Sequence, residues 1–180
     1  MPTDPAAPIL ITVVGIGADG LPGLSDAART LIAEADVLLG SPRQLALLDP
    51  HTAEDFGSAA RGLGVIHTRA AQASPVRLTW PSPLRAGLPA LLHSLPPGRV
   101  VALASGDPLV SGIATTLIGL LGTDAVRVVP AVSSVALARA ALGWSAEETA
   151  VVSLVGRPVA LLARELAPGR RLLALSDRKS

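Results

Sequence analysis

The fold of this 180-residue chain is decided by residues 100–112, which read VVALASGDPLVSG. The apolar run at 100–103 predicts a buried strand, and Gly106-Asp107-Pro108 directly after it predicts a tight turn. A helix-forming segment follows from residue 112. Strand, turn and helix in this order predict a loop at the carboxyl edge of a parallel sheet, where α/β proteins bind ligands. Gly106 would let a ligand approach the backbone closely.

The same alternation of strands and helices continues along most of the chain. Helices are predicted at 25–35, 42–48, 84–93, 112–121, 133–142 and 158–166. Strands are predicted at 9–14, 37–39, 99–104, 126–129, 151–155 and 171–175. This alternation is typical of the α/β class with a parallel sheet. Residues 51–79 lack a periodic pattern, so we interpret them as an irregular excursion with at most a strand at 65–66.

The chain is predicted to contain two domains. A Pro-rich, flexible leader over 1–8 precedes an N-terminal α/β domain over 9–129, and a second α/β domain starts over 130–180. The last predicted strand is followed by residues 176–180 alone, which are too few for a covering helix. Because parallel sheets are covered on both faces, we expect the second domain to be truncated.

Composition narrows the class of protein. Hydrophobic residues make up 49%, charged residues 16% and aromatic residues 2%, which predicts an aliphatic core. A net charge of +1 argues against nucleic acid as the main partner. The absence of cysteine excludes disulfides and thiolate chemistry, and the three histidines lack metal-ligand spacing, so no metal is expected. With no signal peptide and no apolar stretch long enough for a bilayer, we predict a soluble, cytoplasmic protein without a membrane partner.

A glycine-rich loop follows the first predicted strand. Residues 15–20 read GIGADG and match the dinucleotide-binding pattern G-x-G-x-x-G by letter. In that pattern the third glycine lies inside a helix whose N-terminus holds the pyrophosphate. Here LPG follows at 21–23, and the helix is predicted to begin at Ser25. A ligand other than NAD fits this loop better, although an NAD(P)-binding oxidoreductase stays an alternative.

A third loop has the same setting. Residues 129–134 read VPAVSS, between a predicted strand and a predicted helix. Its serines would either cap the helix or offer hydroxyl and amide groups to a ligand. Because all three loops follow strands of one sheet, we expect Gly17, Gly106 and Ser133 to lie along the same edge. Together they predict a pocket without bulky side chains.

The order of these motifs resembles that of the tetrapyrrole methylases, the S-adenosylmethionine-dependent methyltransferases of corrin and sirohaem synthesis. The motifs are VVGIGADG at 13–20, ASGDPLVSG at 104–112 and VPAVSS at 129–134. Supporting motifs are AEADVLLG at 33–40, WPSP at 80–83, ALGW at 141–144 and VSLVGRP at 152–158. The resemblance runs from Ile9 to Asp177 and is strongest to members that methylate carbon 5 of a precorrin. LVS at 109–111 departs from the bulky aromatic residues usual there.

The resemblance implies a class III (tetrapyrrole) methylase fold, with S-adenosylmethionine bound between two α/β domains. It also implies a homodimer and a precorrin substrate in cobalamin biosynthesis. The implied donor contacts are Gly17, Ala18, Gly106, Asp107, Val110, Ser133, Ser134 and Leu175. Arg43 and Arg85 would orient the carboxylates of the substrate. No residue is identified as the base that removes the proton, and a truncated methylase that only binds a partner stays a second alternative.

Overall fold

A computed structural model describes residues 10–49 and 74–176 of the chain. The chain divides into two compact units, Met1–Ala131 and Val132–Ser180. Each unit is built from alternating strands and helices, which we describe unit by unit.

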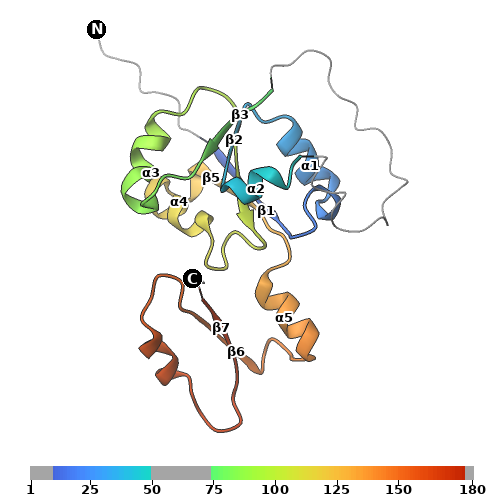
Figure 1. Cartoon of the computed structure of the whole chain (residues 1–180), viewed down its shortest axis with the longest axis vertical. Coiled ribbons are helices and arrows are strands. Elements are labelled where there is room, and N and C mark those ends of the chain that lie inside the picture. The colour runs from blue at the N-terminus through green and yellow to red at the C-terminus, as the bar shows by residue number, and fades with distance from the viewer. Residues whose placement is uncertain (1–9, 50–73, 177–180) are drawn as a thin grey trace. The chain divides into compact units, whose positions relative to one another are not determined.

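The first unit contains a five-stranded sheet with the strand order β3-β2-β4-β1-β5 (Figure 1). The strands are β1 (Ile11–Ile16), β2 (Val37–Gly40), β3 (Val76–Thr79), β4 (Val100–Ser105) and β5 (Val126–Val129). All neighbouring strands are parallel, which confirms the predicted α/β class. In the register of β1 and β4, Gly15 lies opposite Ala104, so these two central strands end side by side.

Helices cover both faces of this sheet. The helices α1 (Asp26–Ala33) and α2 (Pro42–Ala46) pack on one face, where their apolar residues join Val14, Leu38 and Leu103. The helices α3 (Leu84–His93) and α4 (Ile113–Leu121) pack on the other face with Val13 and Ala102. Successive strand residues point to opposite faces, so strands buried on both faces read as continuous apolar runs. This explains why the runs in β1 and β4 predict strands so clearly.

Capping residues start the helices of the first face. The Ala28 backbone N–H donates to Ser25 Oγ at 3.2 Å, which confirms the predicted start of α1. At α2, the Gln44 N–H donates to Ser41 Oγ at 3.2 Å, and the Ser41 N–H donates to Gln44 Oε1 at 2.7 Å. This reciprocal pair is a capping box. These caps place the start of α1 shortly after the 3₁₀ turn at 21–23 and the start of α2 directly after β2.

One strand lies where the sequence predicts irregular structure. β3 forms within the 51–79 excursion and pairs with β2, with Val76 opposite Val37. That part of the prediction is wrong, because β3 is an edge strand whose Val76, Arg77 and Thr79 are exposed. The strand has only four residues and is mostly exposed, so it lacks the continuous apolar run that marks the buried strands. The strand expected at 65–66 lies outside the described residues.

The second unit contains α5 (Ser134–Leu142), β6 (Thr149–Ser153) and β7 (Arg171–Leu175). β6 and β7 form a parallel pair in which Ser153 lies opposite Leu175. β6 begins and ends two residues earlier than predicted. It ends at Ser153 because residues 154–157 turn, with the Arg157 N–H donating to the Leu154 carbonyl at 3.0 Å. The helix predicted at 158–166 is the 3₁₀ helix η4 (Val159–Arg164), which buries no residue. Because none of its residues is buried, this segment lacks the packing that stabilises an α-helix.

Across the described ranges, no helix is both long enough and apolar enough to cross a membrane.

Candidate functional site

The centre of the five-stranded sheet has the geometry of a ligand-binding edge. β1 and β4 are neighbours, but the chain leaves β1 towards α1 on one face and leaves β4 towards α4 on the other. Adjacent strands whose connections depart to opposite faces leave a crevice beyond their carboxyl ends, where open α/β sheets bind ligands. The loops that follow β1 and β4 are those that the sequence predicts to contact a ligand.

Three backbone segments meet at Gly15, the fifth residue of β1. A Cβ added at Gly15 would collide with the Gly106 carbonyl oxygen and would lie 2.7 Å from the Ala131 nitrogen. The Gly106 N–H donates to the Ile16 carbonyl at 2.9 Å. The carboxyl end of β1 is therefore in direct backbone contact with the segments that follow β4 and β5, which only a residue without a side chain allows.

The loop after β4 is closed by its own polar groups. Gly106 has a φ of 60°, which favours glycine. Asp107 Oδ1 accepts a hydrogen bond from the Leu109 N–H at 2.9 Å, and the Asp107 carbonyl accepts one from the Val110 N–H at 3.1 Å. Pro108 is buried, and its carbonyl occupies the space that a side chain at Gly112 would need. One carboxylate oxygen of Asp107 thus shapes the loop.

The loop after β1 is folded around the carboxylate of Asp19. A Cβ added at Gly17 or at Gly23 would lie against this carboxylate, so a side chain at either position would require the Asp19 side chain to move. Ala18 and Asp19 are exposed, whereas Gly20 is buried with a φ of 62°. The exposed carboxylate of Asp19 therefore packs against the two glycines of this turn.

The segment after this loop excludes the dinucleotide-binding geometry. Gly20 precedes the 3₁₀ helix η1 (Leu21–Gly23), and the α-helix begins only at Asp26. The third glycine of the G-x-G-x-x-G pattern is therefore outside any α-helix that could hold a pyrophosphate at its N-terminus. The alternative of an NAD(P)-binding oxidoreductase is not supported.

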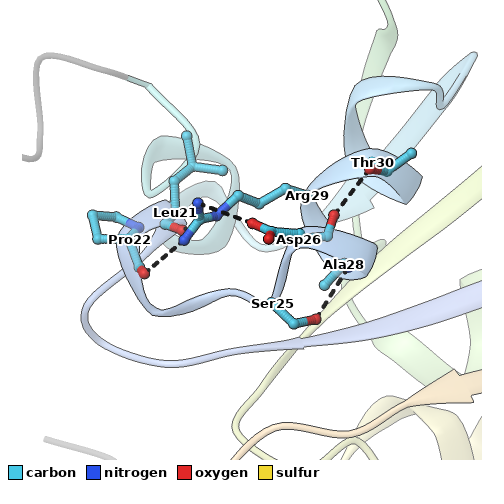
Figure 2. A network of polar contacts seen from close by, with 7 residues as sticks. All are labelled: Leu21, Pro22, Ser25, Asp26, Ala28, Arg29 and Thr30. Atoms are coloured by element: carbon cyan, nitrogen blue, oxygen red, sulfur yellow. Dashed lines mark hydrogen bonds and ion pairs between the residues drawn. The ribbon is translucent and has the colours of Figure 1, made fainter. Parts of the chain in front are cut away.

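Arg29 of α1 holds the η1 turn in place (Figure 2). Its Nε donates to the Leu21 carbonyl at 3.1 Å and its Nη2 donates to the Pro22 carbonyl at 2.9 Å. Asp26 Oδ1 lies 3.6 Å from Nη1 of the same guanidinium. Sequence reasoning missed Arg29, because the spacing of Leu21 and Arg29 does not indicate that the side chain from α1 reaches the carbonyls of η1.

Gln44 is a second residue that sequence reasoning missed. Besides its part in the capping box, its Nε2 donates to Ser105 Oγ at 3.1 Å and so joins α2 to the end of β4. The S-x-x-Q spacing at 41–44 indicates the capping box. The contact with Ser105 depends on β2 and β4 being neighbours, which no local pattern shows.

The two arginines predicted to hold substrate begin neighbouring helices. Arg43 lies in the first turn of α2 and Arg85 in the first turn of α3, and these helices follow the adjacent strands β2 and β3. Both side chains are exposed, and within the described residues neither guanidinium has a hydrogen bond or an ion pair. Arg77, by contrast, is paired with Asp49 at 2.7 Å.

The remaining predicted residues belong to the second unit. Ser133 Oγ accepts from the Ala136 N–H at 3.1 Å and caps α5, of which Ser134 is the first residue. Leu175 is the last residue of β7. The structure brings the Gly15–Gly17 segment and Gly106 together within the first unit, while the position of Ser133 beside them stays a prediction. In the part of the chain that the structure describes, no group of His, Asp and Glu side chains could hold a metal ion.

Comparison with known proteins connects this arrangement to a family. The sequence profile of the Tetrapyrrole (Corrin/Porphyrin) Methylases matches residues 10–179. The precorrin-6Y C(5,15)-methyltransferase [decarboxylating] of Mycobacterium tuberculosis is 40% identical over 173 residues, covering 95% of this chain and 37% of that protein. The cobalt-precorrin-7 C(5)-methyltransferase of Salmonella typhimurium is 30% identical over 168 residues, covering 93% of this chain and 71% of that protein. The chain thus spans 37% of the length of the mycobacterial relative.

A solved structure shares the fold. The precorrin-6Y methylase of Archaeoglobus fulgidus superposes with a TM-score of 0.59 at 24% identity, covering 93% of this chain and 73% of that one. The sheet order, the loops at its carboxyl edge and the match over residues 10–179 lead to one conclusion. This chain belongs to the tetrapyrrole (corrin/porphyrin) methylases.

Proposed function

We propose that this chain methylates carbon 5 of a precorrin in cobalamin biosynthesis, with S-adenosylmethionine as the methyl donor. Its membership of the tetrapyrrole methylases and the names of two relatives, at 40% and 30% identity, support the proposal. The observation that carries it is the backbone contact at Gly15, which builds an edge from small residues where a compact polar ligand can approach the main chain.

The residues at this edge fit the proposed donor. Gly17 and Gly106 are half-buried glycines, Ala18 has the smallest side chain, and both Asp107 and Val110 are partly accessible. Such residues leave room for a folded ligand and offer it backbone amides and carbonyls. When bound, S-adenosylmethionine supplies an electrophilic methyl group on a positively charged sulfonium.

The protein's own contribution is binding and orientation. We assign donor contacts to Gly17, Ala18, Gly106, Asp107 and Val110 of the first unit. Asp19 and Asp107 place negative charge on the loops of this edge, which favours a cationic ligand. Holding two reactants in line can lower a barrier by roughly 7–11 kcal/mol without a catalytic base.

The second unit and two arginines complete the proposal. We assign further donor contacts to Ser133, Ser134 and Leu175. Arg43 and Arg85 would bind carboxylates of the substrate, since a guanidinium can pair with a carboxylate through two hydrogen bonds.

Isothermal titration calorimetry of the full chain tests donor binding directly. The chain should bind S-adenosylmethionine and its demethylated product, and it should not bind NAD. Asp107→Ala removes the side chain that closes the loop after β4, so we expect about tenfold weaker donor binding, the equivalent of one lost hydrogen bond to a charged group. Asp124→Ala removes an equally charged side chain from the 3₁₀ helix η3 (Thr123–Ala125) and should leave the affinity unchanged.

Transfer of labelled methyl from the donor to a precorrin tests the reaction itself. Donor binding without transfer would favour the alternative of a non-catalytic binding module. Absence of donor binding, or equal affinities for the Asp107→Ala variant and the unaltered chain, would refute the proposed site.

A further inference from the structure

A hollow of about 240 Å³ lies entirely within the second unit. It is lined by residues 151–153 of β6 and, from the turn and helix that follow, by Arg157, Leu161, Arg164 and Glu165. Residues 151–153 are the carboxyl end of β6, and β6 is paired in parallel with β7. The hollow therefore lies at the end of a parallel strand where α/β folds bind ligands.

The lining of the hollow is mainly polar and contains aliphatic side chains beside two arginines. Val152 is 9% exposed and Leu161 is half-buried, so both present aliphatic surface at low accessibility. Arg157 and Arg164 are both exposed. Arg157 lies two residues before η4, and Arg164 is its last residue. A ligand that suits this arrangement has an aliphatic portion and an anionic end.

The charge balance of the hollow favours an anion. Glu165 is the one acidic residue in its lining, and Glu165 Oε2 is already paired with Arg170 Nη2 at 2.7 Å. Among the residues that the structure describes, neither the Arg157 nor the Arg164 guanidinium has a hydrogen bond or an ion pair. Two guanidinium groups, each with donors arranged as a planar fork that matches a carboxylate, are therefore available at one site.

The volume limits what can enter. About 240 Å³ is smaller than the roughly 300–1,000 Å³ of pockets that enclose a whole small molecule. A tetrapyrrole macrocycle does not fit, whereas one of its flexible acidic side arms does.

We propose that this hollow binds a carboxylate side arm of the tetrapyrrole substrate. The methylene groups of the arm would pack on Val152 and Leu161, and its carboxylate would receive hydrogen bonds from Arg157 and Arg164. The identity of the ligand rests on the proposed function, and the hollow lies entirely within the second unit.

Binding of a porphyrin with eight carboxylate groups to the full chain tests this assignment. The titration is followed by the shift of the main absorption band of the porphyrin. Arg157→Gln and Arg164→Gln should each weaken binding about tenfold, the equivalent of one charge-assisted hydrogen bond. Arg157→Lys keeps the charge but lacks the planar fork, so it should restore only part of the affinity.

Arg127→Gln is the matched control. Arg127 is an exposed arginine on β5 in the first unit and does not line the hollow, so this variant removes the same charge from outside its lining. Circular dichroism of each variant establishes that the fold is retained. The proposal is overturned if the chain does not bind the porphyrin, or if Arg157→Gln and Arg164→Gln bind it as well as Arg127→Gln does. Complete displacement by inorganic phosphate at an equal concentration would also overturn it, because the site would then be a general anion site.

Calorimetry with S-adenosylmethionine separates this proposal from the proposed function. Arg157→Gln and Arg164→Gln should bind the donor as the unaltered chain does. If donor binding is retained while the two substitutions leave porphyrin binding unchanged, the hollow is refuted and the proposed function stands. If the unaltered chain binds porphyrin through these arginines but does not bind the donor, the methyltransferase proposal is refuted.

Discussion

The two edges of the five-stranded sheet are held together in different ways. At the amino edge, where β2 and β4 begin, charged side chains add to the backbone hydrogen bond from the Asp36 N–H to the Arg99 carbonyl: the Arg99 N–H donates to Asp36 Oδ2 at 2.7 Å, and Arg99 Nη1 pairs with Glu34 Oε2 at 3.1 Å. At the carboxyl edge, the segments after β4 and β5 contact the backbone of β1 at Gly15. Backbone atoms in contact cannot move apart without shifting the strands, whereas exposed ion pairs rearrange at little cost in free energy. The carboxyl edge should therefore be sensitive to a single methyl group, and the amino edge should tolerate the loss of a charge.

The largest effect is expected from Gly15→Ala. The new Cβ would collide with the Gly106 carbonyl and crowd the Ala131 nitrogen, and neither backbone can move without shifting a strand end. We expect the free energy of unfolding to fall by about 3 kcal/mol, at the upper end of overpacking costs. Urea denaturation measures the change.

Gly119→Ala is the control for that substitution. Gly119 lies inside α4, and a Cβ added there meets nothing within 4 Å. Because alanine favours the helix over glycine, this variant should be more stable by about 0.5–1 kcal/mol. If the two substitutions had equal effects, the crowding at Gly15 would not be a property of the folded protein.

Gly106→Ala should separate backbone strain from ligand binding. Gly106 and Gly143 have similar positive φ values of 60° and 63°, but Gly143 ends α5 in open space. Alanine at either position should cost about 1–2 kcal/mol of stability. Only Gly106→Ala should also weaken binding of S-adenosylmethionine in calorimetry, and equal donor affinities in the two variants would argue against the carboxyl edge as the site.

Arg29→Met and Arg99→Met compare the two edges directly. Arg29→Met removes the two hydrogen bonds that hold the η1 turn, while Arg99→Met removes ion pairs at the amino edge. We expect Arg29→Met to reduce stability by about 1 kcal/mol and to weaken donor binding, because the loop around Asp19 loses its support. Arg99→Met should leave donor binding unchanged, and a comparable loss of affinity in both variants would show that the effect is global.

The smallest effect is expected from Glu34→Gln. The side chains of Arg99 and Glu34 are 53% and 49% exposed, so water screens their attraction. The stability should fall by a few tenths of a kcal/mol at low ionic strength, and the difference should vanish in about 1 M salt. A change of more than about 1 kcal/mol would mean that the amino edge is as rigid as the carboxyl edge.

How much of this could be predicted from the sequence depended on how local each signal is. The apolar run in β4 and the helix-capping Ser25 and Ser133 act within a few residues of themselves, and the structure confirms each of them. β3 was missed because it is exposed and gains its hydrogen bonds from β2, far away in the chain. The helix expected at 158–166 became a 3₁₀ helix because no core lies beneath it.

By itself, the sequence determined the parallel α/β class, the order of the loops and the small residues within them, because strand burial, turns and caps follow from neighbouring residues. The same motifs predicted membership of the tetrapyrrole methylases, which the family match confirms. Only the tertiary structure decided that β1 and β4 end side by side, that Gly15 is where three backbones meet, and that Arg29 and Gln44 support the edge. These contacts depend on which strands become neighbours, and strand order follows from how distant segments share one core rather than from any local pattern.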